Sequence, residues 1–308
     1  MNSPQDIEVP LLKLRNASTD EHCEGLRYIK KSFFWWYMGM GGISWNYSVP
    51  FKDQSGKWWY QLKPGLCWPV EVLSPDHSGE EIPLPRKWLG YQHITHDEST
   101  SNSRMMINVI EDLPAFGPAS ITDKRRNIRA GAKNCALELL ERKNLKAAWE
   151  CLEVWKNCNQ RTGWKKRVDS RYFLKSWDML FETPGVSVIL GREAESGKAA
   201  GFLITKLVGD TAYVDTIASC TDLLNTRVND LLMHSFLRSA QAQPEIKKAH
   251  YSLVSYIETL EKFKRSHGFR PVSYPAFTFL MPAVAQLIKY YNLQSYNRMM
   301  GKMEVPAA

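Results

Sequence analysis

The sequence predicts a mixed α/β fold, in which helices cover a sheet of parallel and antiparallel strands. Two apolar, β-prone runs, 199–208 and 211–219, are joined by Gly209-Asp210, a dipeptide typical of a tight hairpin. Helical periodicity resumes after them, and a further apolar run at 250–255 is typical of a strand. Strands that alternate with helices, yet are also joined by hairpins, indicate a mixed sheet rather than a purely parallel one.

The elements expected from residue 124 onward give the order β, α, α, β, β, β, α, β, α, β after an opening basic helix. They are a helix at 124–133, a strand at 135–139, helices at 144–160 and 170–181, strands at 186–190, 199–208 and 211–219, a helix capped by Asn225 or Thr226, a strand at 250–255, a helix carrying Ile257, Leu260 and Phe263, and a strand between Pro271 and Pro282. Gly268 is expected to stop the last helix in the left-handed conformation that glycine adopts easily.

The first 115 residues predict a β-rich region with a helix around 23–31 and short strands at 57–62 and 66–73. They are dense in tryptophan: Trp35, Trp36, Trp45, Trp58, Trp59, Trp68 and Trp88. Aromatic residues at this density form core or, as the alternative, a stacking platform for bases or sugars. The stretch 111–120, with two prolines and a glycine, predicts the domain boundary. We therefore expect regions 1–118 and 119–290, and a tail at 291–308.

The positive charge is concentrated in two segments. The formal net charge is +8, with eight Lys and Arg against three acids in 123–146 and six against one in 161–175. Such segments suit an anionic partner, namely a CoA phosphate, an acidic substrate or RNA, or else form a solvated helix face. The candidate segments for contacts with tRNA or RNA are 124–133 and 161–175.

The cysteines and the termini predict a cytoplasmic protein without a metal site. The six cysteines are scattered, with no CxxC pair and no spacing typical of zinc ligands. The N-terminal residues are polar and lack the pattern of a secretory signal. The longest apolar run, 33–45, is too short to span a bilayer.

The order of elements over 124–285 resembles the GNAT acyltransferase superfamily. The segment 255–269 (SYIETLEKFKRSHGF) is similar to the terminal GNAT motif, and 124–139 (KRRNIRAGAKNCALEL) resembles the start of the second half of Fem-type (FemAB-like) proteins. Fem-type proteins consist of two GNAT-like halves and transfer amino acids from aminoacyl-tRNA. This resemblance implies a GNAT-like domain in the C-terminal half, with the Trp-rich region as a degenerate first half.

The resemblance also implies a binding site for the acyl donor. In GNAT proteins the main chain of the fourth strand pairs with the pantetheine arm of acyl-CoA, which here implicates Ile217, Ala218 and Ser219. The pyrophosphate meets the amides that open the next helix, which here would be those of Thr226, Arg227, Val228 and Asn229. This chain departs from the superfamily because Thr226 and Val228 stand where glycines fall, while Arg227 could supply a charged contact instead.

Two residues are candidates for proton transfer. Strand alternation places Asp215 on one face with Tyr213, Ile217 and Ser219, where its carboxylate could act as the general base. The alternative is that Asp215 pairs with a neighbouring basic side chain. Lys264 occupies the position of the tyrosine with which many GNAT enzymes protonate the leaving thiolate, or else is a solvated helix lysine.

Three functions follow from these expectations. The first is a GNAT-like N-acyltransferase (N-acetyltransferase-like) that moves an acyl group from acyl-CoA, such as acetyl-CoA, to a small-molecule or peptide amine by direct attack. The second is a Fem-type transferase that uses aminoacyl-tRNA. The third is a non-catalytic GNAT-shaped binding or scaffold protein.

Overall fold

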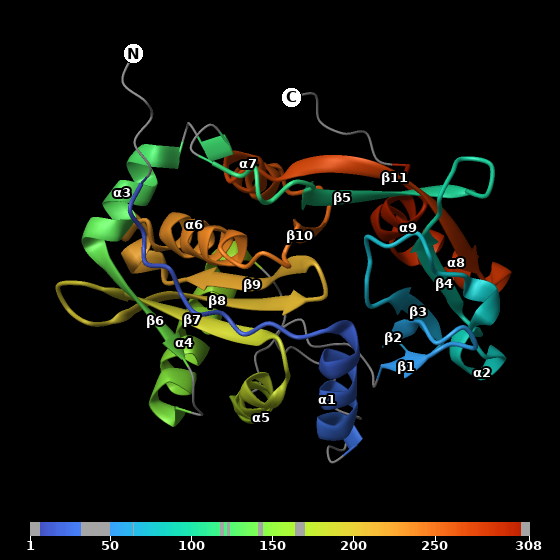
Figure 1. The fold of residues 1–308 in the computed structure, drawn as a ribbon, viewed down its shortest axis with the longest axis horizontal. Coiled ribbons are helices and arrows are strands. Elements are labelled where there is room, and N and C mark those ends of the chain that lie inside the picture. Colours follow the sequence, from blue (N-terminus) through green and yellow to red (C-terminus); the bar gives the residue numbers. More distant parts are fainter. Residues whose placement is uncertain are drawn as a thin grey trace.

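The computed structural model describes residues 7–31, 50–63, 65–117, 120–121, 124–140, 144–163 and 170–302 (Figure 1). The strands are β1 (Phe51–Lys52), β2 (Trp58–Lys63), β3 (Leu66–Pro69), β4 (Gly90–Ile94), β5 (Ser103–Ile110), β6 (Cys135–Leu140), β7 (Val186–Glu193), β8 (Ala199–Val208), β9 (Thr211–Ser219), β10 (Lys248–Leu253) and β11 (Arg270–Leu280). The helices are α1 (Thr19–Lys31), α2 (Leu84–Lys87), α3 (Arg125–Asn134), α4 (Leu145–Thr162), α5 (Ser170–Glu182), α6 (Val228–Gln241), α7 (Glu258–Ser266), α8 (Pro282–Tyr291) and α9 (Leu293–Met299), with short 3₁₀ helices η2 (Gly79–Glu81) and η4 (Thr221–Thr226).

The strands of the described residues form one 11-stranded sheet in the order β1-β2-β3-β4-β11-β5-β10-β9-β8-β7-β6. Within it β9 and β10 run parallel, whereas β6 to β9 form an antiparallel meander. The predicted mixed α/β fold is therefore confirmed. The apolar run 33–45 lies outside the described residues, and no helix within them is long and apolar enough to cross a bilayer.

The hairpin between β8 and β9 forms as predicted, with Val208 opposite Thr211 and Gly209 at φ 59°. The start of the next helix differs from the prediction. Thr226 ends the 3₁₀ helix η4, and Arg227, at φ 64°, is the N-cap of α6. A non-glycine residue in the left-handed region is uncommon. The hydrophobic periodicity of the sequence therefore does not predict the change of backbone conformation at Arg227.

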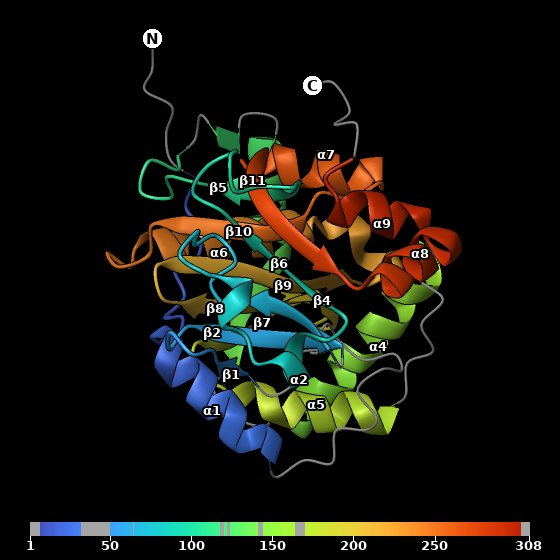
Figure 2. The same ribbon diagram turned by 90° about the vertical axis from the view of Figure 1, so that its right-hand side faces the viewer.

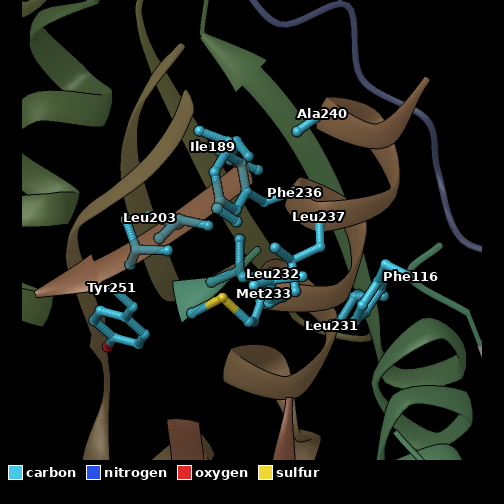
Figure 3. Close-up of a cluster of buried hydrophobic side chains, with 14 of the residues drawn as sticks. Phe116, Ile189, Leu203, Leu231, Leu232, Met233, Phe236, Leu237, Ala240 and Tyr251 are labelled. Atoms are coloured by element: carbon cyan, nitrogen blue, oxygen red, sulfur yellow. The ribbon is translucent and has the colours of Figure 1, made fainter. Parts of the chain in front are cut away.

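Helices cover both faces of the second-half meander (Figure 1). On one face, α6 packs its apolar side against Ile189 and Leu203 (Figure 3). On the other face, α4 and α5 enclose Phe202 and Ile204 of β8. Strands β7 and β8 of this meander are buried on both sides along most of their length, which explains their largely apolar sequence.

The first half contributes a strand to the middle of the sheet. β5 lies between β10 and β11 and runs antiparallel to both. The long strand β11 pairs with β5 along its first part and with β4 along its second part. Helices α8 and α9 follow β11 at the end of the described chain (Figure 2). The two halves of the chain thus share one sheet, although residues 118 and 119 at the predicted boundary lie outside the described residues. The segment predicted as a tail contains α9.

Close packing at the start of α6 gives a prediction on stability. The Val228 side chain lies over Gly191 of β7, where a Cβ would overlap Val228 Cγ2. We expect Gly191→Ala to lower the free energy of unfolding by about 1–3 kcal/mol, as overpacking of a core does. Gly117→Ala, where the nearest atom would be 3.9 Å from the new Cβ, is the matched control. Urea denaturation measures both; equal stability of the two variants would contradict this packing.

Candidate acyl-transfer site

Strands β9 and β10 separate after a short parallel contact. They pair only at Thr211–Lys248, Ala212–Ala249 and Tyr213–His250. Beyond that point Ser252 adopts φ 62°, and Leu253 pairs with Ile107 of β5 instead. In the part of the chain that the structure describes, β9 from Val214 onward is paired only with β8. The two strands therefore splay apart beyond Tyr213 and His250.

A cavity of about 140 Å³, here called the splay pocket, lies where the strands part. One wall comes from the first half and carries the aromatic rings of Tyr60 and Trp68. The other comes from β8, β9 and β10 and carries Lys206, Asp215 and His250. An aromatic wall facing a few ionisable groups is typical of a ligand-binding pocket.

A β-bulge positions Asp215. Ile204 of β8 pairs with Thr216, but the next residue, Thr205, pairs with Val214, so Asp215 is the extra residue. The predicted alternation is therefore wrong beyond this point, because Ile217 packs on the same core face as Val214 rather than opposite it. Bulges redirect a side chain and often accompany active sites. Here the bulge leaves Asp215 lining the splay pocket.

Burial controls the charge of the groups that line the pocket. It raises the pKa of the Asp215 carboxyl, against the lowering effects of the Lys206 ammonium and the Thr216 hydroxyl, which donates to the carboxylate at 3.2 Å. Burial also lowers the pKa of Lys206, although Asp215 opposes this. The pKa of His250 falls to about 3 through burial and the nearby cations Lys206 and Lys264, so its imidazole is neutral at physiological pH. Shifted pKa values of several neighbouring groups in a cavity are typical of functional sites.

The other residues expected to bind the donor lie at the far end of β9. Ile217 is half-buried and Ala218 packs in the core beneath α4. The backbone carbonyl of Ser219 accepts from Arg161 at 3.2 Å, while its hydroxyl accepts from the Asn229 amide at 2.9 Å. These side chains tie the end of β9 to α4 and α6.

The N-terminus of α6 is more closed than a phosphate cradle. Thr226 and Val228 are buried, whereas Arg227 is exposed. Asp230 places a carboxylate in the first turn of the helix, 3.0 Å from Lys124 Nζ and 3.3 Å from His267 Nε2. This carboxylate adds negative charge to the first turn of α6, which disfavours a phosphate at that helix end.

Lys264 does not line the splay pocket. Its side chain is 1% exposed, so the alternative of a solvated helix lysine is wrong. The ammonium lies 2.9 Å from Glu261 Oε1 and donates to the Leu253 carbonyl at 3.2 Å. Glu261 in turn accepts from the backbone N–H of Ser255 at 2.8 Å and from the Asn108 amide at 2.9 Å. The buried pair therefore fixes the end of β10 as it leaves β9.

Helix α3 presents basic side chains beside α6. Arg126, Arg129 and Lys133 are exposed and follow the spacing of one helix face. The helix crosses closely over the start of α6, because a Cβ on Gly131 would lie 2.9 Å from the Arg227 carbonyl oxygen. We call Arg126, Arg129 and Lys133 the α3 basic stripe. Residues 164–169 of the second basic segment lie outside the described residues.

Three pocket residues were missed in the sequence. Lys206 is the only charged residue of the apolar strand β8, and that interruption was a usable signal. His250 begins the predicted strand at 250–255 but has no motif around it. Tyr60 comes from the Trp-rich region, far away in sequence. Among the described residues, no three His, Cys, Asp or Glu side chains are grouped as a metal site.

Comparison with known proteins identifies the fold. No family model and no curated protein matches the sequence. Among solved structures, FemX is similar at a TM-score of 0.56 and 11% identity, covering 91% of this chain and 100% of that one. The C-terminal domain of a protein described as a lysylphosphatidylglycerol synthetase, from Agrobacterium fabrum, gives 0.54 and 13%, covering 94% and 100%. L-PGS from Bacillus licheniformis gives 0.53 and 10%, covering 94% and 99%. The chain therefore has a GNAT-like fold with Fem-type features.

Proposed function

We propose that this protein is an acyltransferase that moves an aminoacyl group from aminoacyl-tRNA to a primary amine in the splay pocket. The observation that carries the proposal is the Asp215 carboxylate, which a β-bulge turns into a cavity between two splayed strands. A cavity in the splay supports a reaction there, rather than the scaffold function. The likeness of almost the whole chain to FemX supports the Fem-type alternative.

In this reaction the amine nitrogen attacks the carbonyl carbon of the aminoacyl ester. A C–N bond forms, the C–O bond to the ribose breaks, and the ribose oxygen leaves as a hydroxyl. Asp215 accepts a proton from the incoming ammonium and returns it to the leaving oxygen. The Lys206 ammonium, close enough to act on Asp215, stabilises negative charge that develops on the carbonyl oxygen.

Two features support an RNA-linked donor over acyl-CoA. The first turn of α6 already holds the Asp230 carboxylate, and its Thr226 and Val228 side chains are buried where GNAT enzymes have glycines. The α3 basic stripe and the exposed Arg227 offer separated cations, which suit a polyphosphate backbone better than a single pyrophosphate. The alternative donor is acyl-CoA, and a direct comparison of the two donors distinguishes between them.

The test compares donors directly. A pool of tRNA charged with radiolabelled amino acids and, separately, radiolabelled acetyl-CoA are incubated with the protein and a mixture of primary amines that includes amino acids, lysine peptides and polyamines. We expect label to move from tRNA to an amine as a stable amide. Transfer from acetyl-CoA alone would overturn the proposed donor. Transfer from neither, with native protein, would support the scaffold function.

RNA binding gives an independent prediction. Replacing Arg126, Arg129 and Lys133 together with alanine is expected to weaken tRNA binding and to reduce the slope of log K against log salt concentration by roughly 2, because three phosphate contacts are lost. Lys289→Ala, which removes an exposed cation on α8, is the matched control. Filter binding at several salt concentrations measures both. An unchanged slope in the triple variant would show that the α3 basic stripe does not contact RNA.

A further inference from the structure

We propose that Tyr60 is a further catalytic residue of the splay pocket, and that His22 is the positioning residue that receives its proton. This inference rests on the proposed function, because it assigns a role within that reaction. It also means that the first half of the chain supplies part of the chemistry.

The hydrogen bonds of His22 fix the direction of this relay. His22 Nδ1 lies 2.7 Å from the carbonyl oxygen of Pro184, and Nε2 lies 2.9 Å from the hydroxyl of Tyr60. A backbone carbonyl can only accept, so Nδ1 carries the proton. In the neutral ring Nε2 is then the acceptor, and the Tyr60 hydroxyl donates to it.

Packing holds both residues in place. His22 is 1% exposed and Tyr60 is 4% exposed. The Tyr60 ring is buried in a cluster with Cys23 and Leu26 of α1 and with Trp58 and Val70. Their fixed positions preserve the short contact between Nε2 and the hydroxyl, as a catalytic pair requires.

Gly25 brings α1 close to Pro184. It lies one helical turn after His22, and a Cβ there would overlap the Pro184 ring. A larger residue would push the helix away from the proline. Gly25 thus permits the approach that orients the His22 ring.

Tyr60 lies where a proton acceptor is needed. Its side chain lines the splay pocket together with Asp215 and His250. Lys206 Nζ lies 5.9 Å from the centre of the Tyr60 ring. Tyr60 and Asp215 therefore line the same cavity from opposite halves of the chain.

The chemistry requires two proton acceptors. An amine reaches the pocket as an ammonium ion and loses one proton to become a nucleophile, and its nitrogen loses a second proton after it has bonded to the acyl carbon. Asp215 takes the first and returns it to the leaving oxygen. The second passes to the Tyr60 oxygen as the phenolic proton passes to His22 Nε2. When the product leaves and water enters the splay pocket, His22 Nε2 returns its proton to the Tyr60 oxygen as the phenolic proton passes to that water, so the transfer is balanced.

The test uses kinetics with isosteric variants and charged tRNA as the donor. Tyr60→Phe keeps the ring and removes the hydroxyl, and we expect kcat to fall about tenfold to a hundredfold with KM unchanged, the low end for acid–base catalysis because Asp215 remains. His22→Gln can still accept a hydrogen bond but cannot take up a proton. We expect the kcat of His22→Gln to fall by the same factor as that of Tyr60→Phe, and the kcat of the double variant to fall no further.

Tyr91→Phe, which removes the hydroxyl of a buried tyrosine that does not line the splay pocket, is the control and should retain full activity. Full kcat in Tyr60→Phe while Asp215→Asn is impaired would overturn the relay and leave the proposed function standing. If His22 only oriented Tyr60, the amide of glutamine could replace it. Full activity in His22→Gln would therefore also overturn the relay. If the wild type transfers from no donor, the proposed function fails and Tyr60 loses its catalytic role with it.

Nitrogen NMR provides a readout that needs no substrate. Long-range proton–nitrogen correlation, with His22 assigned by its loss in His22→Gln, should show the Nδ1–H tautomer. The Nε2–H tautomer at His22 would overturn the relay whatever the transfer assay gives.

Discussion

Asp215→Asn is expected to lower the rate of acyl transfer by roughly 10²–10⁴-fold, the usual range for loss of a general base. Asparagine keeps the shape of the side chain but cannot accept the proton of the amine. The wild-type rate should fall with decreasing pH as the carboxylate becomes protonated. Since burial raises its pKa, this fall should begin at a higher pH than for an ordinary carboxyl. The measurement is kcat against pH for both proteins.

The stability of Asp215→Asn provides the control. Because the pKa in the folded state lies above that in the unfolded state, the ionised carboxylate costs stability once the pH rises through the folded pKa. Lys206, whose own pKa burial lowers, can release its proton when the carboxylate is gone. The melting temperature is therefore expected to be close to that of the wild type. Wild-type kcat in this variant would remove Asp215 from the mechanism.

Lys264→Met is expected to lower the free energy of unfolding by about 3–5 kcal/mol. It removes the cation that lies 2.9 Å from the carboxylate of Glu261, whose side chain is 3% exposed. Burial lowers the pKa of Lys264 against the effect of Glu261, so the charged pair depends on both members being present. Urea denaturation measures the loss, and activity should fall only as far as the folded fraction does.

The double variant Lys264→Met, Glu261→Gln separates charge from packing. Removing both charges should recover part of the stability, since an unpaired buried charge costs more than a neutral pair. As a surface control, Lys156→Met breaks an exposed i, i+3 pair with Glu153 and should cost at most about 1 kcal/mol. A cost for Lys264→Met as small as this would contradict the buried-pair interpretation.

The fold of the second half was predictable because its signals are local. Gly209-Asp210 predicts the hairpin. Gly268, at φ 89°, follows the end of α7 in the left-handed conformation, as expected. The insertion of β5 between β10 and β11 was not predictable. This insertion places strands that are far apart in sequence beside one another. The periodicity of a strand does not indicate which other strands it will pair with.

The candidate site was predictable only in part for a similar reason. Asp215 is visible as a carboxylate in an apolar strand, but the bulge that places it in the cavity changes the alternation on which a sequence argument depends. Lys264 has the appearance of a helix-surface lysine, since its partner Glu261 becomes buried only through tertiary packing. Tyr60 lines the pocket together with residues of the second half, and His22 contacts Pro184 of the second half, and a single sequence does not encode such contacts locally.

The most direct test of the central claim is the location of donor binding by hydrogen–deuterium exchange. The probe is a pool of RNA acceptor-stem hairpins that carry amino acids through stable 3′ amides. We expect slower exchange in β9 beyond Tyr213, in β10 and in α3 when the probe binds. Binding that leaves these segments unchanged and protects another part of the chain would contradict an acyl-transfer site at the splay of β9 and β10.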